Sequence, residues 1–358
     1  MIIDIVKVFI PSTLAFIIGI ILSFVVSHYL YKYKLWKKKV GKVDSQGNAT
    51  VIFNELHKEK EVGTPRMGGI IIWLSVLITT GFLWTIAKII PTNLTEKLDI
   101  LSRNQTWIPL LTLILGALVG LIDDFFEIKG TVGSRLAGGL SLKKRLAVVT
   151  VVSLLCALWF YFKLGVTGIG MPYIGQIHFG WLFIPFFILV TLALYSGGVI
   201  DGIDGLAGGI FAIMFSAYAG IAFYLHQINL ASFCAVVVGG TLAFLWFNIP
   251  PARFYMSETG SMALTITLAA VAFMTDSLGG GHGIIVLPII AFPLLMTTVS
   301  VIIQVLSKKF RNGKKVFMVA PVHHHFEAKG WPSYKVTMRY WVISLVCAIV
   351  GITIALIG

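Results

Sequence analysis

Ten long apolar runs divide the chain, and polar or glycine-rich segments separate them. The runs cover residues 8–29, 69–90, 107–122, 146–162, 179–196, 206–225, 230–247, 262–274, 283–306 and 340–357. A run of about 20 apolar residues is long enough to cross the hydrocarbon core of a bilayer as a helix. The pattern predicts an all-α polytopic membrane protein, with about ten transmembrane helices in a single domain over residues 1–358.

Two regions depart from this simple pattern. Pro288 and Pro293 interrupt the ninth run, which predicts a kinked or broken helix there. The segment 165–180 between the fourth and fifth runs is rich in glycine, and apolar residues alternate along 173–179. This alternation predicts a small β-hairpin outside the membrane.

Basic residues indicate how the helices are oriented. Placing the N-terminus outside makes 31–66, 123–145, 197–205, 248–261 and 307–339 the inner segments, and these hold 23 of the 28 lysines and arginines. Short inner loops carry such an excess in membrane proteins, so both termini are expected outside. The net charge of +13 is then a topology signal, and because no soluble basic domain exists, no nucleic-acid partner is expected.

Carboxylates gather on the inner side. Asp123 and Asp124 end the third run, and Asp201 and Asp204 lie in the sequence DGIDG between the fifth and sixth runs. Adjacent carboxylates repel each other, so a cation is a common reason to keep both ionised, although a solvated helix end is the alternative. Asp201 and Asp204 are three residues apart and can face the same way. Ionisable groups at a membrane boundary are usually functional.

Other polar groups lie on the same side. The loop 248–261 offers Asn248 and Glu258, and a glutamate at a glycine-flanked turn can bind a hard cation, although such a loop is often merely polar. Lys144 and Arg145 begin the fourth helix, where they either contact phosphate or only stop translocation.

Three consecutive histidines, His323, His324 and His325, stand in the last inner segment. Side chains of neighbouring residues diverge on a regular backbone, whereas zinc needs ligands that converge, so a zinc cage is not expected. Hydrogen bonding to a phosphate or sugar is the better functional interpretation.

These groups converge on one side although only basic residues were used to orient the chain. Carboxylates, a divalent ion, cations and histidines at an inner interface suit transfer of a phosphoryl-linked group from a soluble nucleotide to a lipid phosphate. A transporter is the alternative of another class. Transporters gather ionisable groups near the bilayer midplane and often contain internal repeats, and neither is evident in this sequence.

The motifs TPRMGG, LIDD, DGIDGLAGG, FLWFN, YMSETGS and APVHHHFEAKGWP follow one another from residue 64 onward. In this order they resemble the polyprenyl-phosphate N-acetylhexosamine-1-phosphate transferases. The histidine segment resembles the branch of that family that transfers phospho-N-acetylmuramoyl-pentapeptide, and it differs from the members that move N-acetylglucosamine phosphate.

The resemblance implies a reaction in the bacterial cytoplasmic membrane with an active site facing the cytoplasm. Undecaprenyl phosphate attacks UDP-MurNAc-pentapeptide, giving lipid I and UMP, with Mg²⁺ as cofactor and a homodimer as the assembly. Two alternatives remain open: a related enzyme that uses another UDP-sugar, and an inactive paralogue that binds lipid phosphate.

The resemblance also implies residue roles. Asp123 and Asp124 would lie beside the lipid phosphate, one of them as base, and Asp201 and Asp204 would be the loop aspartates. Glu258 would bind the metal together with Asp201. The remaining expected site residues are Asn248 in the FN motif, Tyr255 stacking on uracil, Lys144 and Arg145 at the phosphates, and His323, His324 and His325 toward the diphosphate and sugar.

Four positions depart from the family pattern. Glu258 stands where the family has aspartate, Arg145 where it has lysine, Gly198 where it has asparagine and Arg66 where it has threonine. None of the four is expected to change the fold, but Glu258 and Arg145 change the geometry at charged positions.

Overall fold

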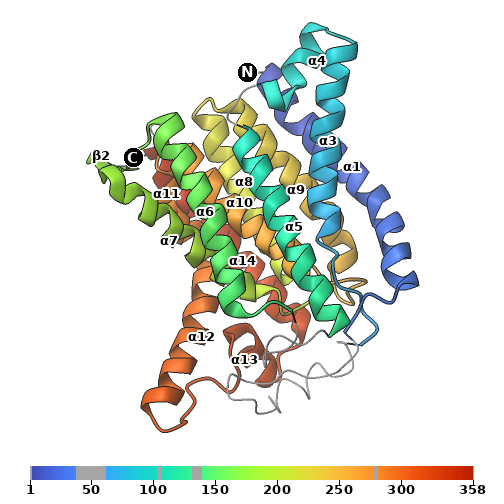
Figure 1. The fold of residues 1–358 in the computed structure, drawn as a ribbon, viewed down its shortest axis with the longest axis vertical. Coiled ribbons are helices and arrows are strands. Elements are labelled where there is room, and N and C mark those ends of the chain that lie inside the picture. Colours follow the sequence, from blue (N-terminus) through green and yellow to red (C-terminus); the bar gives the residue numbers. More distant parts are fainter. Residues whose placement is uncertain (1, 38–61, 103–105, 131–138, 278–280, 358) are drawn as a thin grey trace.

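The computed structural model describes residues 2–37, 62–102, 106–130, 139–277 and 281–357. Within these ranges ten helices are long and apolar enough to cross a membrane, which confirms the predicted all-α polytopic class. They stand side by side in a bundle (Figure 1). The ten are α1 (Ile2–Lys32), α3 (Ile70–Ile89), α5 (Trp107–Lys129), α6 (Leu142–Leu164), α7 (Phe183–Ser196, extended by short 3₁₀ turns), α8 (Leu206–Tyr224), α9 (Ile228–Asn248), α10 (Ser257–Ser277), α12 (Phe292–Phe310) and α14 (Ser333–Ile357).

Helix α10 is the centre of the bundle. It packs against α5, α7, α8 and α11 (Gly283–Ile290), and almost all of its apolar stretch is buried. Small residues allow this close packing between membrane helices. A Cβ atom at Gly120 of α5 would lie 2.2 Å from the carbonyl oxygen of Glu258, and one at Gly116 would lie 2.8 Å from Cα of Ala263. The two backbones therefore touch directly along this seam.

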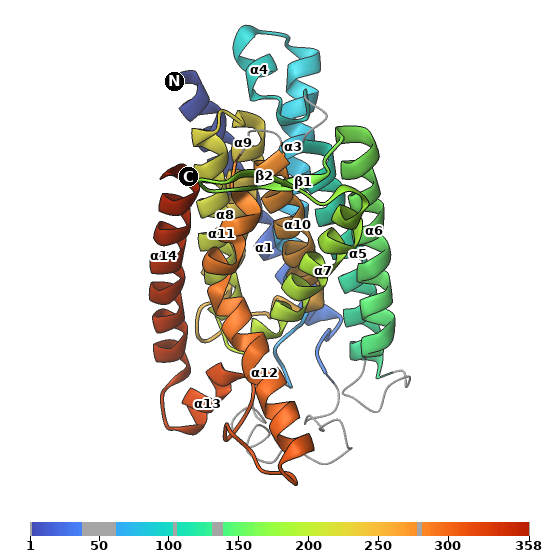
Figure 2. The same ribbon diagram turned by 90° about the vertical axis from the view of Figure 1, so that its left-hand side faces the viewer.

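The proline-containing ninth run forms two helices. Helices α11 and α12 meet at Ala291, and Pro293 occupies the first turn of α12, where its missing N–H removes no helical hydrogen bond. Figures 1 and 2 show α12 leaving the lower end of the bundle, with the short helix α13 (Val322–Ala328) nearby.

The expected hairpin is present near the opposite end (Figure 2). Strands β1 (Gly168–Met171) and β2 (Gly175–His178) pair antiparallel. Asp276, near the end of α10, accepts hydrogen bonds from the backbone N–H groups of Gly170 at 2.7 Å and Ile284 at 3.3 Å. One buried carboxylate thus joins the hairpin to α10 and α11.

The remaining described elements are connectors. Helix α4 (Asn93–Leu98) and the 3₁₀ turn η1 (Ile100–Ser102) follow α3, and the 3₁₀ turns η3 (Gly180–Leu182) and η4 (Gly197–Ile200) flank α7. Much of the predicted inner segment 31–66, and residues 131–138 of the segment 123–145, lie outside the described residues.

The glycine seam gives a first prediction. Gly120→Ala should destabilise the protein by about 1–3 kcal/mol, because the added methyl overlaps the backbone of α10. Gly81→Ala in α3 is the matched control, because a Cβ there meets nothing within 4 Å. Thermal unfolding of both variants in detergent measures the difference. Equal melting temperatures would show that the two helices do not approach this closely.

Candidate active site

The charged residues predicted from the sequence meet at the lower end of the bundle. The last turns of α5, the start of α6, the loop from η4 to α8 and the first turn of α10 supply them. These segments are far apart along the chain, and α10 and α5 hold them together.

Arg145 joins two carboxylates from different helices. Its guanidinium contacts Asp123 through both Nε, at 3.0 Å, and a terminal nitrogen, at 2.8 Å, while the other terminal nitrogen lies 2.6 Å from Glu258. The backbone N–H of Leu140 also donates to Asp123, at 2.6 Å. A two-pronged contact of this kind needs the planar fork of arginine, which lysine lacks. Two of the four departures from the family pattern therefore touch each other.

Asp124 holds the first turn of α10. Its carboxylate accepts hydrogen bonds from the backbone N–H groups of Glu258, at 3.2 Å, and Thr259, at 3.0 Å, and from the Thr259 hydroxyl at 2.5 Å. The first N–H groups of a helix have no partner within the helix, and a side-chain oxygen normally satisfies them. Here the capping oxygen comes from another helix. Asp124 thereby fixes the position of Glu258.

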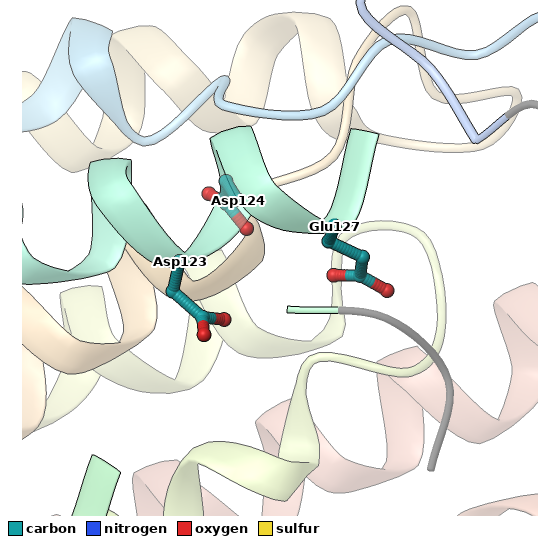
Figure 3. Close-up of side chains that lie close together, drawn as sticks. All are labelled: Asp123, Asp124 and Glu127. Atoms are coloured by element: carbon teal, nitrogen blue, oxygen red, sulfur yellow. The ribbon is translucent and has the colours of Figure 1, made fainter. Parts of the chain in front are cut away.

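Asp123, Asp124 and Glu127 form an acidic group near the end of α5 (Figure 3). One oxygen from each lies within 4.8 Å of the others, which is compatible with a shared metal ion. Glu127 also contacts Lys37, at 2.9 Å, and Arg66. The Arg66 departure therefore has a carboxylate partner. Since Asp123 and Asp124 have partners as well, hydrogen bonds and cations already balance much of the negative charge.

The DGIDG loop is fixed by its polar groups. Asp201 accepts from the backbone N–H of Ser257 at 2.8 Å, which places it beside Glu258 at the start of α10. Asp204 accepts from the backbone N–H of Ala252 at 3.2 Å. Gly205 has a φ of 75°, a value that favours glycine.

Asn248 connects this loop to the next one. Its side-chain oxygen accepts from the N–H of Gly205 at 3.0 Å, and its NH₂ group donates to the carbonyl of Phe254 at 2.8 Å. The side chain is buried, so we assign Asn248 to positioning the loops. Helix α14 supports the same loop, since the indole of Trp341 donates to the carbonyl of Gly205 at 3.2 Å.

Two histidines pack on the DGIDG loop. A Cβ at Gly202 would lie 2.6 Å from Nε2 of His323 and 2.7 Å from Nε2 of His324, so only glycine leaves room for both rings. The two ring centres are 4.3 Å apart. The expectation that the neighbouring histidines diverge is therefore wrong for this pair.

His325 points elsewhere. Its Nδ1 accepts from the backbone N–H of Met318 at 3.2 Å, and its ring contacts Phe317. Burial lowers the pKa of His325, which favours the neutral ring. Lys144 is exposed. Neither side chain is brought to the acidic residues by a contact that the structure describes.

Tyr255 lies in the loop before α10. Its backbone pairs with Pro65 and Gly68, and its hydroxyl bonds to Thr64. Burial raises the pKa of Tyr255 to about 12, so the phenol is neutral at physiological pH. The backbone and hydroxyl of Tyr255 thus join the TPRMGG segment to the loop before α10.

Several supporting residues were not predicted from the sequence. Glu327 contacts Nδ1 of His324 at 2.7 Å and accepts from the Ser333 hydroxyl at 2.7 Å, an arrangement that orients an imidazole. The spacing of three between His324 and Glu327 was a usable signal, because such residues share a helix face.

Gln304 of α12 holds the segment that leads to the histidines. Its amide oxygen accepts from the N–H groups of Val316 and Phe317, at 3.1 and 2.9 Å, and its NH₂ group donates to the carbonyl of Phe317 at 2.8 Å. Ser300 likewise accepts from the N–H of Val322 at 2.9 Å. No sequence pattern predicted that side chains of α12 would bind the backbone of this irregular segment.

Comparisons with known proteins identify relatives of this chain. Residues 106–276 match the model of glycosyl transferase family 4. The chain is 36% identical to a phospho-N-acetylmuramoyl-pentapeptide-transferase from Listeria innocua, over 83% of this chain and 86% of the relative. Proteins with the same description from Halalkalibacterium halodurans, 36% identical over 82% of this chain and 84% of the relative, and from Chloroflexus aggregans, 30% identical over 99% and 91%, also match.

The bundle of membrane-spanning helices and the match over residues 106–276 thus indicate a polytopic membrane transferase. Within that class, the chain belongs to the phospho-N-acetylmuramoyl-pentapeptide-transferase family.

Capping of α10 by Asp124 leads to a prediction. Asp124→Ala leaves three donors without their acceptor and should destabilise the protein by roughly 2 kcal/mol or more. Asp124→Asn retains one oxygen acceptor and should destabilise it less. Thermal unfolding of the purified variants ranks them. If Asp124→Ala melted like the wild type, the cap would not hold α10.

Proposed function

We propose that the protein transfers phospho-MurNAc-pentapeptide from UDP-MurNAc-pentapeptide to undecaprenyl phosphate, yielding lipid I and UMP. A phosphate oxygen of the lipid attacks the phosphorus that carries the sugar. The bond from this phosphorus to the UMP oxygen breaks, and UMP leaves. The observation that carries the proposal is the meeting of Asp123, Arg145, Glu258 and Asp201 at one end of a family member's bundle.

The site residues suit a reaction controlled by charge and position. Arg145 orients the Asp123 carboxylate through its two contacts, and Asp123 is the candidate base at the lipid phosphate. His323 and His324, held on Gly202, are candidate donors to the diphosphate or the sugar. Asp204 and Tyr255 are proposed to line the part of the site that binds the nucleotide, since the loops that contain them meet just before α10.

Glu258 and Asp201 are the proposed Mg²⁺ ligands. The donor set fits, because Mg²⁺ prefers carboxylate oxygens and the two residues meet at the first turn of α10. Bound there, the ion would supply positive charge to the diphosphate and the leaving group. Asp123, Asp124 and Glu127 are the second candidate set, since their oxygens already lie close together.

The proposed orientation places the charged end of the bundle in the cytoplasm. The inner-loop excess of basic residues supports this orientation, because such loops remain on the cytoplasmic side. A bacterial inner membrane location follows, with a soluble UDP-linked substrate on one side and a lipid carrier within the bilayer. A homodimer remains a prediction from the family resemblance.

The proposal is tested by UMP release from purified, detergent-solubilised protein supplied with UDP-MurNAc-pentapeptide, undecaprenyl phosphate and Mg²⁺. We expect release that stops when EDTA removes the metal and returns when Mg²⁺ is restored. UDP-GlcNAc in a parallel reaction should release none. Release with UDP-GlcNAc alone would favour the related hexosamine transferase, and a folded protein that is silent with both substrates would favour an inactive paralogue.

Contact between Arg145 and Glu258 predicts non-additive effects. Arg145→Lys should lower kcat roughly tenfold, since it breaks the 2.6 Å contact with Glu258. Glu258→Asp should retain or raise activity if this position binds the metal, because aspartate is the residue of the family pattern. The double variant restores the lysine and aspartate of the family pattern and should regain part of the activity that Arg145→Lys loses, because residues in contact couple by about 0.5–3 kcal/mol. Steady-state UMP release by the four proteins measures this.

The control for the same type of replacement is Lys163→Arg, because Lys163 is exposed and lies at the other end of the bundle. A double variant no more active than Arg145→Lys would show that Arg145 and Glu258 act independently.

A further inference from the structure

Helix α12 has two unlike faces. Its buried polar residues are Thr297, Ser300, Gln304 and Ser307, a spacing that places them on one side of a helix. Its other side is apolar and exposed, and it includes Leu295, Val299, Ile302, Val305 and Leu306. In a membrane protein such an exposed apolar face contacts lipid.

A rigid basic turn follows the apolar face. We call residues 308–315 the α12 tip. The N–H of Arg311 donates to the carbonyl of Ser307 at 2.8 Å, the N–H of Gly313 donates to the carbonyl of Lys308 at 2.9 Å, and the hydroxyl of Ser307 donates to the carbonyl of Lys314 at 2.9 Å. These bonds define the shape of the turn without a ligand.

The tip exposes positive charge beside an aromatic ring. Lys309, Arg311, Lys314 and Lys315 are exposed, and Phe310 is 74% exposed. The sequence has no acidic residue between Asp276 and Glu327. Among the residues that the structure describes, none forms an ion pair with these four cations. An anionic partner from outside the chain would complement them.

We propose that the α12 tip is a docking surface for the headgroups of anionic phospholipids. The apolar face of α12 places the tip where the hydrocarbon ends and headgroups begin. Each lysine or arginine near an anionic membrane surface contributes about 1 kcal/mol, which is about a fivefold change in affinity. Phe310 is suited to insertion at the same level, as aromatic residues of interfacial helices are.

A headgroup bound at the α12 tip would affect the histidines through α12. The opposite face of the helix holds the segment 316–322 through Gln304 and Ser300, and this segment leads directly into His323. A headgroup that restrains the tip therefore also restrains the element that positions the histidine segment.

Binding of fluorescent phosphatidylglycerol to the purified, detergent-solubilised protein tests the proposal without relying on catalysis. The test variant is Lys309→Gln/Lys314→Gln/Lys315→Gln. The matched control is Lys88→Gln/Lys97→Gln/Lys163→Gln, which neutralises three exposed lysines elsewhere. We expect the tip variant to bind at least about tenfold more weakly than the wild type, and the control to bind like the wild type.

Competition identifies the ligand. Unlabelled phosphatidylglycerol should displace the probe, whereas phosphatidylcholine and inorganic phosphate should not. Equal binding by all three proteins would overturn the proposal, as would displacement by inorganic phosphate. In UMP-release assays, a tip variant that raised KM for the UDP-sugar without weakening phosphatidylglycerol binding would assign the cations to the nucleotide instead.

Discussion

The structure depends on satisfying the polar start of a helix that is buried at the centre of a membrane bundle. A helix start that is buried in protein has no water for its first backbone N–H groups, so other side chains must supply their partners. Asp124 does this for α10 from the neighbouring helix, and the glycines of α5 bring the two backbones close enough. The same seam therefore stabilises the bundle and places Glu258. The sequence predicts a catalytic role for Asp124, whereas in the structure its carboxylate accepts the hydrogen bonds that hold the start of α10.

Charge balance is the second constraint. The side chains of Asp123, Glu127 and Glu258 lie close together and are at most 24% exposed, so unpaired charges there would be costly. Arg145 contacts two of them, while Lys37 and Arg66 contact the third. Positively charged side chains thus allow several carboxylates to share a small volume. Arriving phosphates would exchange some of these internal contacts for contacts with substrate, which is how such a site can bind anions although it is rich in acids.

The sequence predicted the membrane spans well because their signal is simple. A run of apolar residues of bilayer length has few other interpretations, and prolines marked the change of direction at α11 and α12. The hairpin also followed from local alternation. The gathering of polar motifs at one end was likewise predictable, because basic residues report on orientation independently of those motifs.

Contacts within the site were less predictable because they join distant segments. Nothing local indicates that Asp124 caps α10 or that Asn248 pairs with Gly205 rather than with substrate. The roles of Gly202 and Gly205 also differ for reasons visible only in three dimensions, since one leaves room for two imidazoles and the other adopts a positive φ. Motifs identified which residues matter, and packing decided what each one contacts.

Helix α12 shows how a broken membrane span can have one polar face and one apolar face. A continuous helix across 283–306 would direct its polar residues into lipid or require them to be apolar. Breaking the span at Ala291 allows α12 to leave the bundle, so that its polar side faces the returning chain and its apolar side faces outward. The histidine segment is then held by the side chains of a helix whose opposite face is apolar and exposed. One helix thereby links the proposed lipid-facing surface to the arrangement of the site.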